Sequence, residues 1–96
     1  MKHNNNEISL KHAINQYIRV ISESRSQNTA RSYSQAITKF TTLLTESNID
    51  TDTTTITSCS ESWIIDFIDE LRNYSPATEQ LYLTAVVGFY EFLASE

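Results

Sequence analysis

The sequence predicts an all-α domain, a bundle of four helices arranged as two helical hairpins. Apolar residues recur with the 3.6-residue period of an amphipathic helix in four separate segments. One glycine and one proline in 96 residues leave few tight turns, which disfavours a many-stranded sandwich or barrel. A chain of this length with 40% apolar residues can bury one small core, so a single domain is expected.

The first two helices are predicted over residues 9–24 and 27–46. The apolar stripe of the first is Leu10, Ala13, Ile14, Tyr17, Ile18 and Ile21. The apolar stripe of the second is Ala30, Tyr33, Ile37, Phe40 and Leu44. Ser26 or Asn28 is expected to cap the second helix, because their short polar side chains accept hydrogen bonds from the free N–H groups of a first turn.

The apolar period stops at residues 47–58, where threonine dominates. Threonine is β-branched and disfavours helix, so this segment is predicted to be a connector. Ile49 and Ile56 are expected to anchor the connector to the core. Residues 53–57 have the composition of a short extended stretch.

The remaining sequence predicts a third and a fourth helix. Ser58 and Glu61 have the spacing of a capping box, which is expected to open the third helix. Its apolar stripe is Ile64, Phe67, Ile68 and Leu71. Ser75 as N-cap and Pro76 as the first helical residue then open a fourth helix that extends to about residue 94.

The second half of the chain repeats the first at a spacing of 49 residues. The matching positions are Ser26, Thr29, Tyr33, Ala36, Phe40 and Leu44, and then Ser75, Thr78, Tyr82, Ala85, Phe89 and Leu93. Amphipathic helices share a period by necessity, but they do not require the shared Ser-x-x-Thr opening. The repeat therefore predicts two hairpins with similar packing. The side chains expected to be mutually buried are Tyr33, Ile37, Phe40, Phe67, Ile68, Tyr82, Ala85, Phe89 and Leu93.

Groups suited to reaction chemistry are sparse, and no catalytic residue is predicted. His3 and His12 have no cysteine or carboxylate at metal-ligand spacing, so no metal site is expected. The acidic stretch that begins at Asp50 is similar to a calcium loop, but Thr55 stands where that loop requires glycine. The sequence also lacks a glycine-rich phosphate loop, so no cofactor is expected.

Two single residues have structural interpretations. Cys59 has no obvious base partner and is expected to be a small, buried or half-buried residue at a helix start. Gly88 lies inside the fourth helix, where it marks a close contact between helices, a hinge, or no particular role.

Charge is divided unequally along the chain, whose net charge is −5. Residues 1–40 hold six of the seven Lys and Arg residues and have a net charge of +4, whereas residues 41–96 have a net charge of −9. Such a division marks an anionic partner on the basic side, or else chance placement on solvated faces. One cysteine, no signal-peptide core and no long apolar run predict a cytoplasmic protein without a membrane segment.

Three segments together resemble the core-binding domain of tyrosine recombinases, the phage-type integrases and Xer-like recombinases. The string SQNTARSY at residues 26–33 is similar to the opening of that domain. The string SPAT at residues 75–78, with the apolar positions that follow, is similar to its last helix. Residues 56–58 and the helix at residues 63–71 fit its middle segment. The resemblance covers residues 8–95.

The resemblance implies a SAM-like four-helix domain that grips one side of a recombination site. It divides the chain into a flexible N-terminal tail at residues 1–8 and a core-binding domain at residues 9–96. In this family a separate C-terminal domain performs strand exchange through a 3′-phosphotyrosyl intermediate, so these 96 residues are expected to be an inert DNA-binding half. The implied partners are double-stranded DNA and, through the full-length protein, other recombinase protomers.

The resemblance places the second and fourth helices toward the major groove. The DNA-binding residues that it implies are Thr29, Arg31, Ser32, Gln35 and Lys39 on the second helix, and Thr78, Gln80 and Thr84 on the fourth. Thr29 and Thr78 fit equally well as local caps, and Arg31 as a solvated surface residue. Relatives often carry basic residues in the positions after Tyr33 and Thr78, where this chain has Ser34 and Gln35, and Glu79 and Gln80. Weaker binding than theirs is therefore expected.

Two other interpretations remain open on the sequence alone. A helical protein-interaction module would use the acidic second half, through Asp66, Asp69 and Glu70 on the third helix. A small stand-alone regulator would use a helix-turn-helix, but no adjacent pair of helices has the short glycine-containing turn of that motif.

Overall fold

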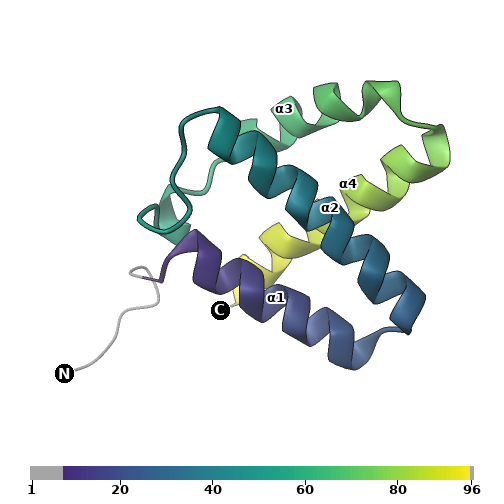
Figure 1. Ribbon diagram of the computed structural model, residues 1–96. Coiled ribbons are helices and arrows are strands. Elements are labelled where there is room, and N and C mark those ends of the chain that lie inside the picture. The colour runs from purple at the N-terminus through teal and green to yellow at the C-terminus, as the bar shows by residue number, and fades with distance from the viewer. Residues whose placement is uncertain (1–7, 96) are drawn as a thin grey trace.

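The computed structural model describes residues 8–95, and four α-helices account for most of them (Figure 1). The helices are α1 (Leu10–Ser24), α2 (Gln27–Glu46), α3 (Ser62–Glu70) and α4 (Pro76–Ser95), with the short 3-10 turns η2 (Ile56–Ser58) and η3 (Leu71–Asn73). The predicted all-α class and the two hairpins, α1–α2 and α3–α4, are confirmed. None of these helices combines the length and the apolar character that a membrane span needs.

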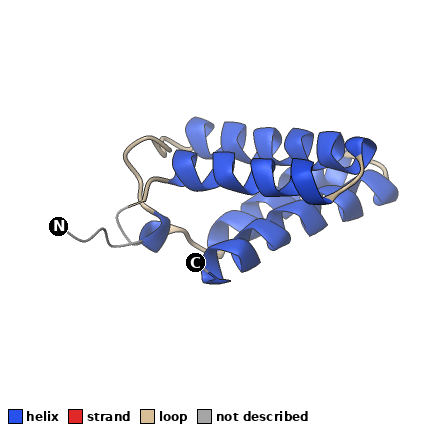
Figure 2. Ribbon diagram, turned by 90° about the horizontal axis from the view of Figure 1, so that it is seen from below, coloured by secondary structure: helices blue, strands red, loops and turns tan. Residues whose placement is uncertain are grey.

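The four helices form a flat domain that measures 47 × 31 × 18 Å. Figure 1 shows α1 and α3 along opposite edges, with α2 and α4 crossing between them, and Figure 2 shows the narrow profile. The most extensive contact between helices joins α2 to α4. The two hairpins are therefore held together mainly by their second helices.

Matching positions of α2 and α4 have matching environments. Ala36 and Phe40 of α2 are fully buried, and so are their counterparts Ala85 and Phe89 of α4. Tyr33 and Tyr82 are both half-buried. The pair at the ends of the two helices differs, because Leu44 is buried whereas Leu93 is half-buried. The similar packing predicted from the repeat is confirmed along most of its length.

The predicted core is confirmed at five positions and corrected at four. Ile37, Phe40, Phe67, Ala85 and Phe89 are buried. Tyr33, Tyr82 and Leu93 pack against the core but remain half-buried. Ile68 is half-buried and is not among the described side chains that pack on the core. The physical reason is the position of α3 at an edge of the domain, where only the face that bears Phe67 can point inward.

The predicted start of α3 is wrong. Ser58 lies in η2, and α3 begins at Ser62, whose N–H donates a hydrogen bond to Ser60 Oγ at 3.1 Å. Glu61 precedes the helix and makes no capping hydrogen bond through its side chain. The connector turns earlier than its sequence suggests, because the Ile56 N–H donates to the Ile8 carbonyl at 3.0 Å. The extended stretch considered at residues 53–57 is reduced to one antiparallel bridge, between Ser9 and Thr55.

The connector also completes the start of α1. The Leu10 N–H donates to the Thr54 carbonyl at 2.8 Å, and the Lys11 N–H donates to the Thr51 carbonyl at 3.0 Å. The first N–H groups of a helix have no partner within the helix, so these carbonyls satisfy donors that would otherwise need solvent. Residues 1–7 of the predicted N-terminal tail, which include His3, lie outside the described residues.

Gly88 allows a close contact between α1 and α4. The Tyr17 hydroxyl of α1 donates a hydrogen bond to the Ala85 carbonyl of α4 at 2.9 Å. A Cβ atom added at Gly88 would lie 2.5 Å from that hydroxyl oxygen, well inside van der Waals contact. Of the interpretations of this glycine, the close contact between helices therefore accounts for it.

Candidate nucleic-acid interface

The openings of α2 and α4 are built alike. At α2, the Thr29 N–H donates to Ser26 Oγ at 3.2 Å, and the Ser26 hydroxyl donates to Thr29 Oγ1 at 3.0 Å. At α4, Thr78 and Ser75 repeat both hydrogen bonds at the same distances. Ser26 and Ser75 therefore act as the N-caps, and Thr29 and Thr78 make local hydrogen bonds with them, while each threonine hydroxyl hydrogen remains available to a further acceptor.

Both openings lie at the same end of the molecule. The α1–α2 turn and the α3–α4 turn stand at the right of Figure 1 and of Figure 2. Lys39, in the middle of α2, lies close to the α4 opening, because its ammonium is 5.4 Å from the centre of the Tyr74 ring, two residues before α4. The neighbouring Tyr74 hydroxyl raises the pKa of Lys39, which carries its positive charge at this edge.

The free N–H groups differ between the helix starts. At α1, the carbonyls of Thr51 and Thr54 occupy them. At α4, the first residue is Pro76, which has no N–H, and Glu79 adds a negative charge to the first turn. α2 has neither of these features, and its first turn holds no acidic residue. Of these three helix starts, that of α2 is therefore best suited to an anion, because free donors and the helix dipole act together there.

Basic side chains free of acidic partners gather around α2. The ion pairs found between residues 8 and 95 are Lys11–Asp52, Arg19–Glu23 and Arg72–Asp69. Arg25, Arg31 and Lys39 take part in none of them. Arg25 ends α1 and directly precedes the Ser26 cap, and it is exposed. Arg25 is not among the DNA-binding residues that the resemblance implies. Its position next to the Ser26 cap could nevertheless be recognised from the sequence.

The predicted DNA-binding residues differ in their exposure to solvent. Arg31, Gln35, Gln80 and Thr84 are exposed, whereas Thr29, Ser32, Lys39 and Thr78 are half-buried. Arg31, Gln35 and Lys39 are spaced four residues apart, so one side of α2 carries all three. The structure thus joins an arginine, an amide and a lysine into one stripe, and Lys39 reaches the turn before α4.

The tyrosines with altered proton affinity are not suited to nucleophilic attack. Burial raises the pKa of Tyr17 to about 12, and its hydroxyl is engaged by the Ala85 carbonyl. Burial also raises the pKa of Tyr90, whose hydroxyl donates to the Ser60 carbonyl. Both phenols keep their protons near neutral pH, and an attacking tyrosine needs the opposite shift or a base beside it.

Cys59 and the acidic connector offer no reaction chemistry either. Cys59 is half-buried, and burial raises the pKa of its thiol, so it is held in the unreactive form. Asp52 is paired with Lys11, and the Asp50 carboxylate accepts the Asp52 N–H at 2.9 Å. Within residues 8–95, no three His, Cys, Asp or Glu side chains lie close enough to hold a metal ion.

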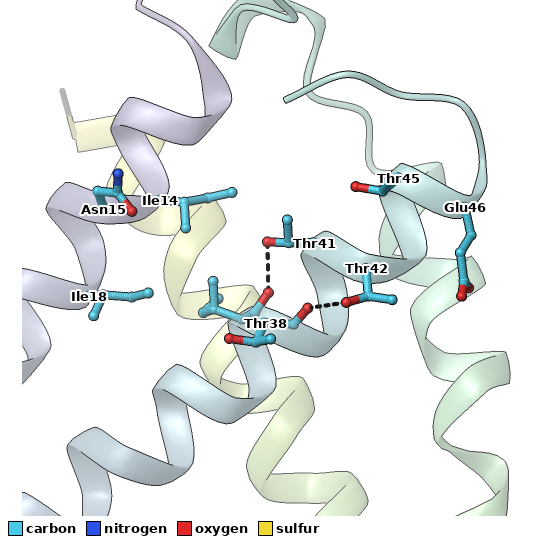
Figure 3. Close-up of a pocket in the computed structure, with 9 residues that line it drawn as sticks. Ile14, Asn15, Ile18, Thr38, Thr41, Thr42, Thr45 and Glu46 are labelled. Carbon is cyan, nitrogen blue, oxygen red and sulfur yellow. Dashed lines mark hydrogen bonds between the residues drawn. The ribbon is translucent and has the colours of Figure 1, made fainter. Parts of the chain in front are cut away.

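A shallow groove of about 350 Å³ runs between α1 and α2 (Figure 3). Its floor is apolar, with Ile14 and Ile18, and threonines of α2 form one wall. The Thr41 hydroxyl donates to the Ile37 carbonyl at 2.9 Å, and the Thr42 hydroxyl donates to the Thr38 carbonyl at 3.0 Å. The hydrogens of these two hydroxyls are thus used within α2, and Asn15, Thr38, Thr45 and Glu46 form the rest of the polar lining.

Comparison with known families gives one match. The family described as phage integrase, N-terminal SAM-like domain, matches residues 14–96. Comparison with curated proteins found no match, and comparison with solved structures also found none. The matched region begins inside α1 and includes all of α2, α3 and α4.

Proposed function

Because the chain belongs to the family of phage integrase N-terminal SAM-like domains, we propose that it grips one side of a recombination site in double-stranded DNA. Its task is to position a recombinase on DNA, and strand exchange belongs to a catalytic domain elsewhere in the parent protein. Its partners are the duplex and other recombinase protomers assembled on it. The place of action is the cytoplasm.

The observation that carries this proposal is the uncovered start of α2. Free N–H donors, Arg25 and Arg31 converge there without an acidic residue in the first turn. Helix ends and arginines bind phosphates and fix the position of a protein on DNA, whereas glutamine reads adenine edges. In this arrangement Arg31 contacts the backbone, and Gln35, one turn further along α2, faces the bases.

The α4 opening contributes a second and weaker contact. Thr78, Gln80 and Thr84 supply hydroxyl and amide groups, but Glu79 repels phosphates and Pro76 supplies no donor. Lys39, held against Tyr74, supplies a positive charge beside this opening. Binding at both openings spans the edge of the domain that carries the two turns.

Reversal of one charge at the α2 opening tests this interface. With about three to four phosphate contacts, the plot of log affinity against log salt concentration has an expected slope near −3. Arg31→Glu should weaken binding to all sequences about equally and reduce the slope by about one or more, since it removes a phosphate contact. Fluorescence anisotropy at several salt concentrations measures both quantities. Amide shifts on DNA should cluster at residues 27–35 and 76–84.

Lys11→Glu is the matched control for that variant. It makes the same change in net charge at the opposite end of α1, where Lys11 is paired with Asp52. Equal losses of DNA affinity in the Arg31→Glu and Lys11→Glu variants would mean that binding depends only on net charge, and the proposed interface would be wrong. Gln35→Ala or Gln80→Ala should instead narrow the difference in affinity between cognate and random duplexes.

A separate prediction concerns covalent chemistry. Residues 1–96 incubated with duplex DNA near neutral pH should form no covalent adduct, because Tyr17 and Tyr90 keep their protons there and their hydroxyls donate to the Ala85 and Ser60 carbonyls. Denaturing electrophoresis followed by mass spectrometry detects such an adduct. A tyrosine-linked product made by these residues alone would contradict the assignment of strand exchange to another domain.

A further inference from the structure

Lys39 of α2 lies against the aromatic ring of Tyr74, which belongs to the other hairpin. Its ammonium is 5.4 Å from the centre of the ring, within the distance at which a ring face attracts a cation. Lys39 takes part in none of the ion pairs found between residues 8 and 95. Tyr74 also raises the pKa of Lys39 more than the carboxylates of Glu70 and Glu46 do. An aromatic ring, rather than a carboxylate, therefore holds this cation.

Tyr74 is itself held in place by the second hairpin. Its N–H donates a hydrogen bond to the carbonyl of Leu71 at 3.0 Å, and Leu71 is fully buried. Its ring packs against Tyr82 of α4, with ring centroids 5.7 Å apart and ring planes inclined by 52°. Both tyrosines also pack on the hydrophobic core. The second hairpin therefore supplies a fixed platform for a cation of the first hairpin.

An aromatic platform affects a nearby lysine differently from a carboxylate. A carboxylate neutralises the charge, whereas a ring face attracts the ammonium and leaves its charge and its N–H donors available to a phosphate. A free lysine side chain is long and flexible, and ordering it on binding costs affinity. The contact with Tyr74 restricts Lys39 before DNA binds, so part of this ordering takes place when the domain folds.

We infer that Tyr74 is a positioning residue, which holds the Lys39 ammonium in place for a phosphate of the DNA backbone. The inference rests on the proposed function, because the position of Lys39 matters for binding only if Lys39 contacts DNA. Tyr74 itself does not contact DNA in this arrangement and acts through Lys39. The second hairpin thus strengthens the binding made by α2, although its own helix start carries the negative charge of Glu79.

A double-mutant cycle measures whether Tyr74 acts through Lys39. Tyr74→Leu should weaken binding to a duplex of random sequence about threefold to tenfold, as expected when one lysine side chain must be ordered on binding. In the Lys39→Gln background the same change should have no effect. Tyr74→Phe keeps the ring and should recover the affinity that leucine loses. Phe92→Leu is the matched control, because Phe92 is also half-buried and packs against a second ring, that of Tyr17 at 5.5 Å, and it should leave the affinity unchanged.

The dependence of affinity on salt separates positioning from direct contact. Lys39→Gln removes a phosphate contact, so the slope of log affinity against log salt concentration should become shallower by about one. Tyr74→Leu leaves the lysine charge in place, so the affinity should fall while the slope stays the same. A slope that also becomes shallower with Tyr74→Leu would contradict a positioning role.

Proton chemical shifts of Lys39 test the contact without DNA. The Tyr74 ring current should move the signals of the methylene protons beside the ammonium upfield, and this displacement should disappear with Tyr74→Leu and persist with Tyr74→Phe. Thermal unfolding checks that every variant is folded. Absence of the displacement, or an equal loss of DNA affinity from Tyr74→Leu in both backgrounds, would overturn the inference.

The same measurements distinguish failure of this inference from failure of the proposed function. If Arg31→Glu weakens DNA binding but Lys39→Gln does not, Tyr74 has no phosphate contact to position, and the inference is wrong while the proposed function stands. If neither variant weakens binding, the proposed function itself is wrong.

Discussion

Replacement of Phe40 or Phe89 with alanine is expected to lower the free energy of unfolding by about 3–5 kcal/mol. Both side chains are fully buried. The Phe40 ring meets Phe67 edge-on with centroids 5.5 Å apart, and the Phe89 ring lies 5.5 Å from Tyr17. Alanine at either position removes the aromatic contacts and leaves a cavity that rigid neighbouring helices fill only in part.

Urea unfolding measures the loss. A domain of this size has a total stability of about 5–10 kcal/mol, so either variant should be marginally folded. Ile65→Ala is the matched control, because Ile65 is 62% exposed and its truncation should change stability by less than about 0.5 kcal/mol. Unchanged urea midpoints for the two phenylalanine variants would contradict the core assignment.

The two losses should also be coupled. Phe40 and Phe89 both contact Tyr90, each with ring centroids 6.2 Å apart. Residues that share a neighbour do not contribute additively, so the double variant should differ from the sum of the single variants by at least about 0.5 kcal/mol. Additive losses would mean that the shared contact with Tyr90 does not couple the two positions energetically.

Gly88→Ala is expected to destabilise the domain by about 1–3 kcal/mol, although alanine favours helix by about 1 kcal/mol over glycine. The added Cβ would lie 2.5 Å from the Tyr17 hydroxyl oxygen. Either the buried hydrogen bond from Tyr17 to the Ala85 carbonyl breaks or α1 moves away from α4. Steric conflict at this position therefore outweighs the gain in helix propensity.

Tyr17→Phe provides the corresponding rescue. Removal of the hydroxyl alone should cost about 1 kcal/mol through the lost hydrogen bond. In the Gly88→Ala background the same change removes the conflicting atom, so the double variant should be more stable than Gly88→Ala alone. Urea midpoints of the unaltered chain, the two single variants and the double variant complete the double-mutant cycle. If the two losses simply add, the close contact does not explain this glycine.

The sequence predicts those features of the fold that depend on neighbouring residues. The bounds of α2 and the start of α4 follow from a serine cap, a threonine three residues later and an uninterrupted apolar stripe. The start of α3 does not follow from its own sequence, because it depends on the hydrogen bond between Ile56 and Ile8, which are far apart in sequence. Ile68 is likewise half-exposed because α3 lies at an edge of the domain. The apolar period of α3 does not indicate that position.

The candidate interface likewise has some features that the local sequence predicts and others that it does not. Helical spacing is enough to place Arg31 and Gln35 on one exposed side of α2. The contact between Lys39 and Tyr74 requires the crossing of two hairpins, which no local pattern describes. No local signal indicates that the connector covers the start of α1, and this covering is what distinguishes α1 from α2 as a site for phosphate.

The bonds between the connector and α1 have a consequence for folding during synthesis. The first hairpin ends at residue 46, but the carbonyls that complete α1 belong to Thr51 and Thr54. Phe40 needs Phe67 and Tyr90 for its packing, so the ribosome must add another 44 residues after residue 46 before that pocket closes. At ordinary elongation rates this takes roughly 2–9 s. The nascent first hairpin therefore stays open to chaperones until α4 emerges from the exit tunnel.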